Sequence, residues 1–86
     1  MTKQELVELA NRINLLENRS QYGHWSNLKR DKFGDYDYDF VLMNGRDNHT
    51  KTIYSFSEPQ EAEELFQIVQ QVFEGKATFE DFVAKF

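Results

Sequence analysis

The 86-residue chain contains no cysteine, which excludes disulfide bonds, thiolate nucleophiles and thiolate metal ligands. It has one proline and only four glycines, and the glycines are not grouped as in a phosphate-binding loop. No apolar run is long enough to span a membrane, and no signal-like apolar block follows Met1. These absences predict a soluble cytoplasmic protein that does not bind membranes.

Basic residues are also few, because ten Lys and Arg face fifteen Asp and Glu, for a formal net charge of -5. Nucleic-acid binding needs a cationic surface, so we expect no direct contact with nucleic acid. An acidic chain is better suited to a basic protein partner. Aromatic residues, at 15%, supply much buried area per residue, and one core is expected across a single domain, 1–86.

The N-terminal third predicts a helix followed by a strand. Thr2 and Glu5 fit a capping box, and apolar residues then recur at helical spacing, which predicts a helix over residues 3–18. Residues 21–30 alternate weakly and predict a first strand.

The middle of the chain predicts a hairpin. Tyr36, Tyr38, Phe40 and Leu42 fall on one face of a strand, and the segment TKTIYSF, 50–56, alternates as the returning strand. The residues between them, 44–49, predict a loop longer than the tight two-residue turn.

The C-terminal part predicts two helices. Ser57 is the expected N-cap of the first, Gly75 closes it, and Thr78 caps a short last helix. The predicted fold is a small α+β domain with the order helix, three-stranded antiparallel sheet, helix and short helix, with its helices packed on one sheet face. The predicted shared core consists of Tyr38, Phe40, Leu65, Phe66, Val69 and Phe73.

Signatures of catalysis and metal binding are missing. The acids at 35, 37 and 39 have the spacing of a calcium loop, but Phe40 and Arg46 occupy the positions of its glycine and its bidentate acid. His24 and His49 lie in separate segments and do not form a ligand pair in the sequence. No nucleophile motif occurs. We therefore expect no enzyme, no cofactor and no metal.

Asp35, Asp37 and Asp39 form a row of acids on the solvent-exposed face of the second strand, opposite the rings. Alternate residues of a strand lie about 6.6–6.8 Å apart, which approaches the roughly 6–7 Å between neighbouring DNA phosphates. The row therefore fits a short phosphate track. It also fits a solvated sheet face whose charges prevent edge-to-edge aggregation.

The order of elements, together with NGRDN at 44–48 and EGKATFEDF at 74–82, resembles a group of small acidic phage anti-CRISPR proteins. Those proteins inhibit a single-protein, RNA-guided DNA nuclease by occupying its PAM-reading groove as DNA mimics. Acids in their strand loops and around their last two helices make the contacts. The resemblance implies that Asp47, Glu80 and Asp81 contact a partner, and it implies the cytoplasm of a phage host.

Two functional hypotheses follow. In the first, the chain is a non-enzymatic inhibitor whose carboxylates at Asp35, Asp37, Asp39 and Asp47 occupy a basic nucleic-acid-binding groove of a partner protein. In the second, it is a protein-interaction module with Trp25 as an aromatic anchor and no DNA mimicry, because Trp is a common interface hot spot. Steep salt dependence would favour the first hypothesis.

Overall fold

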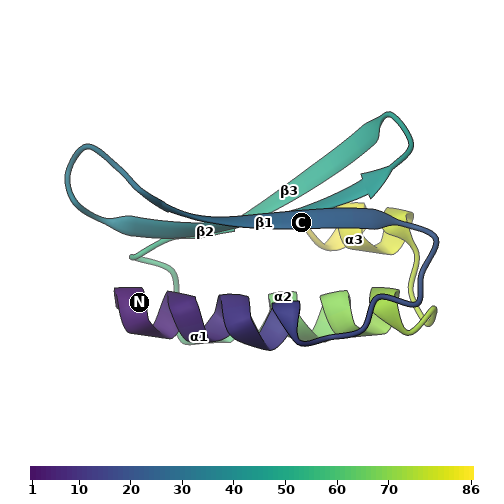
Figure 1. The fold of residues 1–86 in the computed structure, drawn as a ribbon, viewed down its shortest axis with the longest axis horizontal. Helices are drawn as coiled ribbons and strands as arrows, with labels where there is room; N and C mark the ends of the chain where they lie inside the picture. The colour runs from purple at the N-terminus through teal and green to yellow at the C-terminus, as the bar shows by residue number, and fades with distance from the viewer.

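The computed structural model describes residues 1–86 and contains α1 (Lys3–Asn14), β1 (Gly23–Arg30), β2 (Tyr36–Asn44), β3 (Asp47–Ile53), α2 (Pro59–Phe73) and α3 (Phe79–Lys85). The strands form one antiparallel sheet in the order β1-β2-β3. All three helices lie on one side of this sheet, and the other side is uncovered (Figure 1). The predicted α+β class, with helices on one face of a three-stranded antiparallel sheet, is confirmed.

Local capping motifs start two of the helices as predicted. The Thr2 hydroxyl accepts a hydrogen bond from the Glu5 N–H (3.1 Å), and the Glu5 carboxylate accepts one from the Thr2 N–H (3.0 Å). Thr78 and Asp81 make the same reciprocal pair at α3, at 3.1 and 2.8 Å. None of the three helices combines the length and the apolar character that crossing a membrane requires.

The start of α2 differs from the prediction, because Glu58 is the N-cap instead of Ser57. Ser57 is buried, and its hydroxyl accepts a hydrogen bond from the Tyr54 N–H at 2.9 Å. The Glu61 carboxylate accepts from the Glu58 N–H at 2.9 Å. Ser57 therefore closes the turn before the helix, and the acid pair one residue later starts it.

The first helix is shorter than predicted, since α1 ends at Asn14 although the apolar pattern continues through Leu16. The side chain of Asn18 organises the segment that follows. Its oxygen accepts from the Ser20 N–H and hydroxyl, and its Nδ2 donates to the Tyr22 carbonyl and His24 Nδ1, both at 2.9 Å. Local side-chain bonds of this kind compete with helix formation, and β1 consequently begins at Gly23, not at residue 21.

His24 connects this turn to the core and makes folding sensitive to acid. Its ring centroid lies 4.6 Å from that of Phe73, and its Nδ1 can accept from Asn18 only while unprotonated. Burial lowers the pKa of His24 below its ordinary value of 6.5. As the pH falls, the unfolded chain binds this proton before the folded chain does, so the free energy of unfolding decreases below about pH 6.5.

We expect His24→Gln to weaken this pH dependence, because a glutamine carbonyl still accepts from Asn18 but does not titrate. Urea unfolding of both proteins at pH 7.5 and pH 5.5 tests the expectation. The loss of stability on acidification should be smaller in the variant. Equal losses in the two proteins would show that His24 is not the titrating group.

The β2–β3 connection is tighter than predicted. Asn44 pairs directly with Asp47, so only Gly45 and Arg46 form the turn, whereas a loop over 44–49 was predicted. Gly45 has a φ of 63° and Arg46 does not have a positive φ. A glycine with positive φ at the first central position is typical of a type II′ turn, whose twist matches the flanking strands.

The core lies between the inner face of the sheet and the helices, and it includes Tyr38, Phe40, Leu65, Val69 and Phe73 as predicted. The predicted core residue Phe66 is only partly buried. The Arg12 guanidinium lies over its ring, 4.0 Å from the centroid. The core also takes in residues that the prediction omitted, among them Leu6, Leu9, Ile13, Ile53 and Phe82.

The third strand ends at Ile53, whereas the alternation predicted it through Phe56. Past this point the rings of Tyr54 and Phe56 stack on each other, with centroids 4.8 Å apart and planes at 6°. The Phe56 ring is 80% exposed, so this pair lies at the surface and not in the core.

Candidate functional site

The side of the sheet that no helix covers is called the outer face. Residues that pair across the strands point to the same side, so the register defines this face. It consists of Trp25, Asn27 and Lys29 of β1, Asp37, Asp39, Val41 and Met43 of β2, and Asn48, Thr50 and Thr52 of β3.

Two of the three predicted acids on this face are held within the protein. Asp37 is only 9% exposed, and its carboxylate accepts from the Ser55 N–H at 3.3 Å. The Asp39 carboxylate lies 3.0 Å from Lys29 Nζ and accepts from the Thr52 hydroxyl at 2.7 Å. The contact between the Lys29 ammonium and the Asp39 carboxylate also raises the pKa of Lys29.

The expectation of a fully solvent-exposed acid row is therefore wrong. Asp35 alone of the three is exposed, and it precedes the start of β2. The chain after β3 covers Asp37, and the neighbouring strands neutralise Asp39. A phosphate track needs carboxylates that a partner can reach, and these two already have partners.

Asp39 should accordingly contribute to stability, in contrast to Asp35. We expect Asp39→Ala to lower the free energy of unfolding by about 1–2 kcal/mol, because it removes a charge-assisted hydrogen bond and an ion pair. Asp35→Ala is the matched control and should change it by no more than about 0.5 kcal/mol. Chemical denaturation of both variants measures the difference, and equal effects would mean that the Asp39 contacts add nothing.

The other predicted contact acids lie away from the outer face. Asp47 pairs with Asn44, so it belongs to the helix-facing side at the exposed end of the hairpin. Glu80 and Asp81 are exposed in the first turn of α3, where the Asp81 carboxylate already accepts from the Thr78 N–H. The structure does not bring these three acids together with Asp35, Asp37 and Asp39 on one surface.

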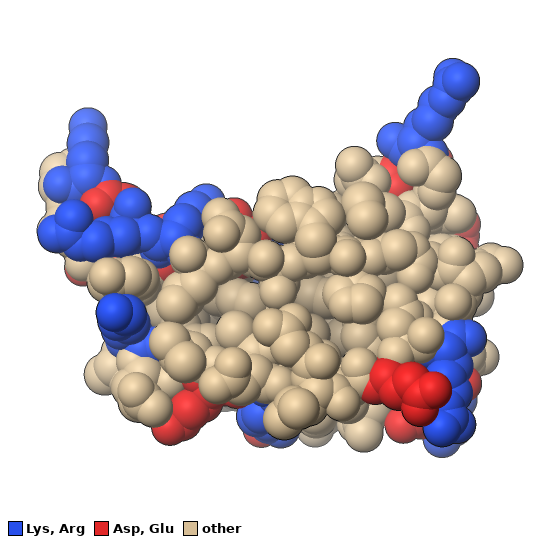
Figure 2. Space-filling view, viewed as in Figure 1, with Lys and Arg blue, Asp and Glu red and all other residues tan.

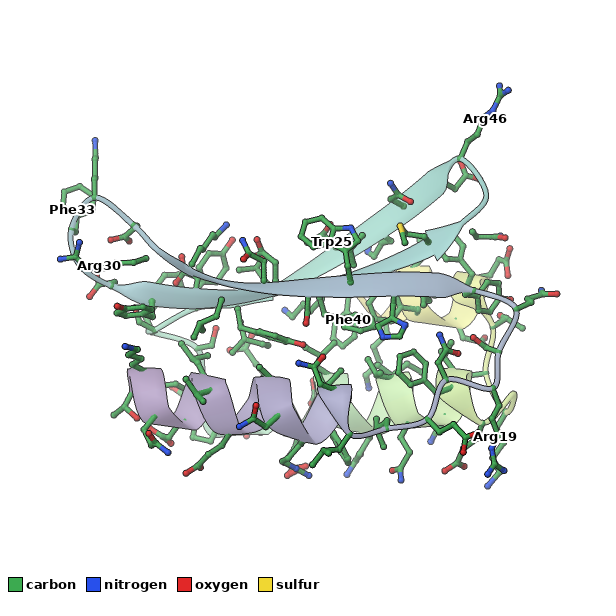
Figure 3. The ribbon with its side chains drawn as sticks, viewed as in Figure 1. Arg19, Trp25, Arg30, Phe33, Phe40 and Arg46 are labelled. Atoms are coloured by element: carbon green, nitrogen blue, oxygen red, sulfur yellow. The ribbon has the colours of Figure 1, made fainter.

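Trp25 is the one predicted site residue that dominates the outer face. It lies in β1 opposite Val41 and points away from the helices, whereas Phe40 points toward them (Figure 3). The Trp25 side chain is 50% exposed, while Val41 beside it is nearly buried. Asn27, Asn48 and Thr50 around them are exposed and uncharged.

Both ends of the sheet rise away from the helices and make the outer face concave (Figure 1). Arg30 and Phe33 mark one raised end and Arg46 marks the other, with Trp25 between them (Figure 3). The space-filling view, in which the outer face is seen edge-on, shows Lys and Arg side chains projecting at both raised ends (Figure 2). Arg30, Lys32 and Arg46 take part in none of the five ion pairs.

The net charge lies outside the sheet and its loops, in the helices and the segments that flank them. Residues 23–56, which hold the sheet and its loops, contain five basic and five acidic residues, so their formal charge is zero. The remaining five basic and ten acidic residues account for the whole charge of -5. The two sides of the molecule therefore present different electrostatic surfaces to a partner.

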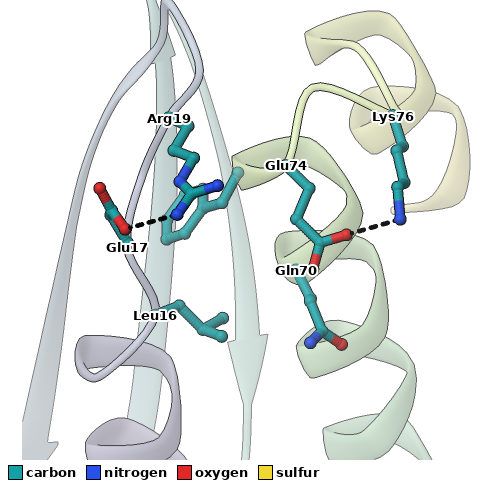
Figure 4. Close-up of a pocket in the computed structure, with 7 residues that line it drawn as sticks. Leu16, Glu17, Arg19, Gln70, Glu74 and Lys76 are labelled. Atoms are coloured by element: carbon teal, nitrogen blue, oxygen red, sulfur yellow. Dashed lines mark hydrogen bonds and ion pairs between the residues drawn. The ribbon is translucent and has the colours of Figure 1, made fainter.

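The largest groove lies elsewhere, between the chain that follows α1 and the C-terminal end of α2 (Figure 4). It has a volume of roughly 510 Å³, and Leu16 and Phe73 are its apolar residues. Its charged residues form pairs with each other, Glu17 with Arg19 at 3.1 Å and Glu74 with Lys76 at 3.0 Å. The lining contains no histidine, serine, threonine or tyrosine.

No three His, Asp or Glu side chains lie together as potential metal ligands. The scan against protein-family models and the searches of curated proteins and of solved structures each found no match. Function must therefore be inferred from the site itself.

The sequence interpretation selected Trp25 but missed the residues around it. Val41, Asn27 and Thr50 become its neighbours only through the strand register, which depends on the lengths of both connections. Arg30, Lys32 and Arg46 are visible in the sequence as cations beside aromatic residues and in the hairpin loop, but their position at the two raised ends of the outer face follows only from the fold.

Proposed function

We propose that this protein is a non-enzymatic protein-binding domain and that its partner docks on the outer face around Trp25. The observation that carries the proposal is a half-exposed tryptophan on the edge strand β1, between the two raised ends of a sheet face that no helix covers. A tryptophan in this position offers a large apolar area and one N–H donor, and such residues are enriched among interface hot spots.

The surroundings of Trp25 resemble the composition of protein interfaces. Charged residues are depleted at the centre of such interfaces, and polar groups make hydrogen bonds around it. Asn27, Asn48 and Thr50 supply uncharged donors and acceptors, and the one ion pair on the face, Lys29 with Asp39, is satisfied internally. A partner that covers this face does not have to desolvate an unpaired carboxylate in its middle.

The raised ends favour a partner with acidic groups at its margins. Arg30 and Lys32 at one end and Arg46 at the other are free of ion pairs and flank the uncharged centre. Charges at the rim of an interface act mainly on the association rate and on selectivity. The partner expected here therefore presents an apolar pocket or ridge for Trp25 with carboxylates on either side.

Photocrosslinking tests the location of the docking surface. Trp25 is replaced by benzoylphenylalanine in one protein and Leu15 in another, because Leu15 is an equally apolar side chain, 86% exposed, at the end of α1. We expect a protein to be crosslinked from position 25 and not from position 15, and wild-type protein to compete with this crosslink better than Trp25→Ala. Identical products from both positions would overturn the proposal.

An inhibitor that occupies a basic nucleic-acid-binding groove, such as that of a CRISPR nuclease, is the second candidate. One observation favours it: the whole net charge of -5 resides outside residues 23–56, in the helices and the segments that flank them. In this candidate the carboxylates that replace phosphates are exposed ones on the helices, such as Glu5, Glu8 and Glu64, and not those of the acid row. Salt separates the candidates, because binding through helical carboxylates should weaken steeply as ionic strength rises, and anchoring by Trp25 should weaken little.

A further inference from the structure

The first strand, β1, is an open edge of the sheet. The Asp31 N–H donates to the Asp35 carbonyl at 2.8 Å, and this pair continues the β1–β2 register. Hydrogen-bonded pairs alternate in an antiparallel ladder, so the N–H and C=O groups of His24, Ser26 and Leu28 point away from β2. No hydrogen bond joins these outward groups to another part of the chain.

This edge lacks the features by which proteins usually prevent strand addition, such as proline, bulges, a covering element or charges along the strand. The eight pairs of β1 with β2 run without interruption, which excludes a bulge. The first six residues of β1 are uncharged, and Lys29 and Arg30 come only at its end. The opposite edge, β3, is shorter and carries Asp47 and Lys51, and Lys51 forms an ion pair with Glu61 of α2 at 3.6 Å.

The uncharged surface continues from β1 onto α1 below it. Arg12 pairs with Glu63 of α2 at 2.8 Å, which directs that flank of α1 toward α2. Helical geometry places Val7, Ala10 and Asn14 on the opposite flank, on the same side of the molecule as the β1 edge. Figure 2 views this side of the molecule, and its middle holds no Lys, Arg, Asp or Glu, while charges lie at its two ends and along its lower margin.

We propose that this surface binds a second copy of the chain, with β1 pairing antiparallel to β1 of the second copy around a two-fold axis. A strand edge of this kind complements itself, because each outward N–H meets an outward C=O of the other copy. The whole molecule spans 36 by 23 Å in this view, and the proposed contact takes in the uncharged middle of this side, along the β1 edge and the flank of α1 below it. The uncharged middle keeps the charge of -5 on each copy away from the contact.

In the proposed register Asn27 lies on the two-fold axis. It places Trp25 opposite Lys29 of the second copy, where the ammonium can lie against the indole ring. The six-stranded sheet that results has one continuous outer face with two Trp25 side chains. The proposed dimer thus doubles the docking surface, but it forms without the partner and does not depend on the proposed function.

Sedimentation equilibrium of the purified chain between 5 and 500 µM tests the dimer. We expect the mass to approach twice 10.3 kDa as concentration rises. Ser26→Pro removes an outward N–H, and proline is tolerated on a free edge, so this variant should stay folded by circular dichroism and dissociate at least about tenfold more readily.

A pair of charge variants keeps the test valid if proline disturbs the fold. Asn27→Lys places like charges opposite each other in the dimer, whereas within one copy the new lysine faces Asp39, so dimerisation should weaken while the single chain stays folded. Asn48→Lys makes the same change on β3 and should leave the dimer intact. A monomer at every concentration, or a dimer that both β1 variants leave unchanged, would overturn the proposal, whatever happens to Trp25-dependent binding.

Discussion

Truncation of Phe40 to alanine is expected to lower the free energy of unfolding by about 3–5 kcal/mol, the range observed for fully buried phenylalanines. Phe40 has no exposed surface, and its ring contacts His24, Phe73 and Phe82, with centroids 5.7 to 6.2 Å away. It therefore joins β1, β2, α2 and α3 at one point. Small domains have only about 5–15 kcal/mol of total stability, so this single change should remove a large share of it.

Phe66 provides the matched control, since it is the same residue type on the helix that packs over the sheet. Its ring is only partly buried and lies under the Arg12 guanidinium at the margin of the core. Phe66→Ala should cost no more than about 2 kcal/mol, because part of the ring faces water in the folded state as well. Urea denaturation of both variants measures the contrast. Equal losses would mean that the two rings are equally important to the core.

The fold could be predicted from the sequence wherever the determining signal is local. Thr2 with Glu5 and Thr78 with Asp81 are pairs three residues apart, and both form the predicted caps. The alternation around Phe40 correctly assigned the buried face of β2 because a strand has a period of two residues. Such signals do not depend on distant parts of the chain.

Predictions failed where side-chain hydrogen bonds override the periodic pattern. The pattern of α1 continues through Leu16, but α1 ends at Asn14, and Asn18 in the segment that follows bonds to Tyr22 and His24. Asp37 appeared solvent-exposed from its alternation alone, yet Ser55, eighteen residues later, covers and binds it. The same limit applies to the candidate site, because Trp25 was recognised as a residue type while its neighbours follow from strand register.

Trp25→Ala is expected to weaken binding of the partner by about 2 kcal/mol or more, which corresponds to roughly 30-fold in the dissociation constant. The half of the side chain that is exposed in the free protein is the part available to a partner. The fold should survive the change, because the core between sheet and helices does not include this residue. The effect should appear mainly in the dissociation rate, as for most hot-spot residues.

The decisive measurement is a titration of the protein crosslinked from position 25 against wild type, Trp25→Ala and Leu15→Ala at low and high salt. If the domain docks through its outer face, Trp25→Ala should bind roughly 30-fold more weakly than wild type. Leu15→Ala should bind within about twofold of wild type, and the affinity of the wild type should change little with salt. The proposed function would be contradicted if Trp25→Ala bound as tightly as wild type and the wild-type affinity fell steeply at high salt. That result would favour binding through the helical carboxylates instead.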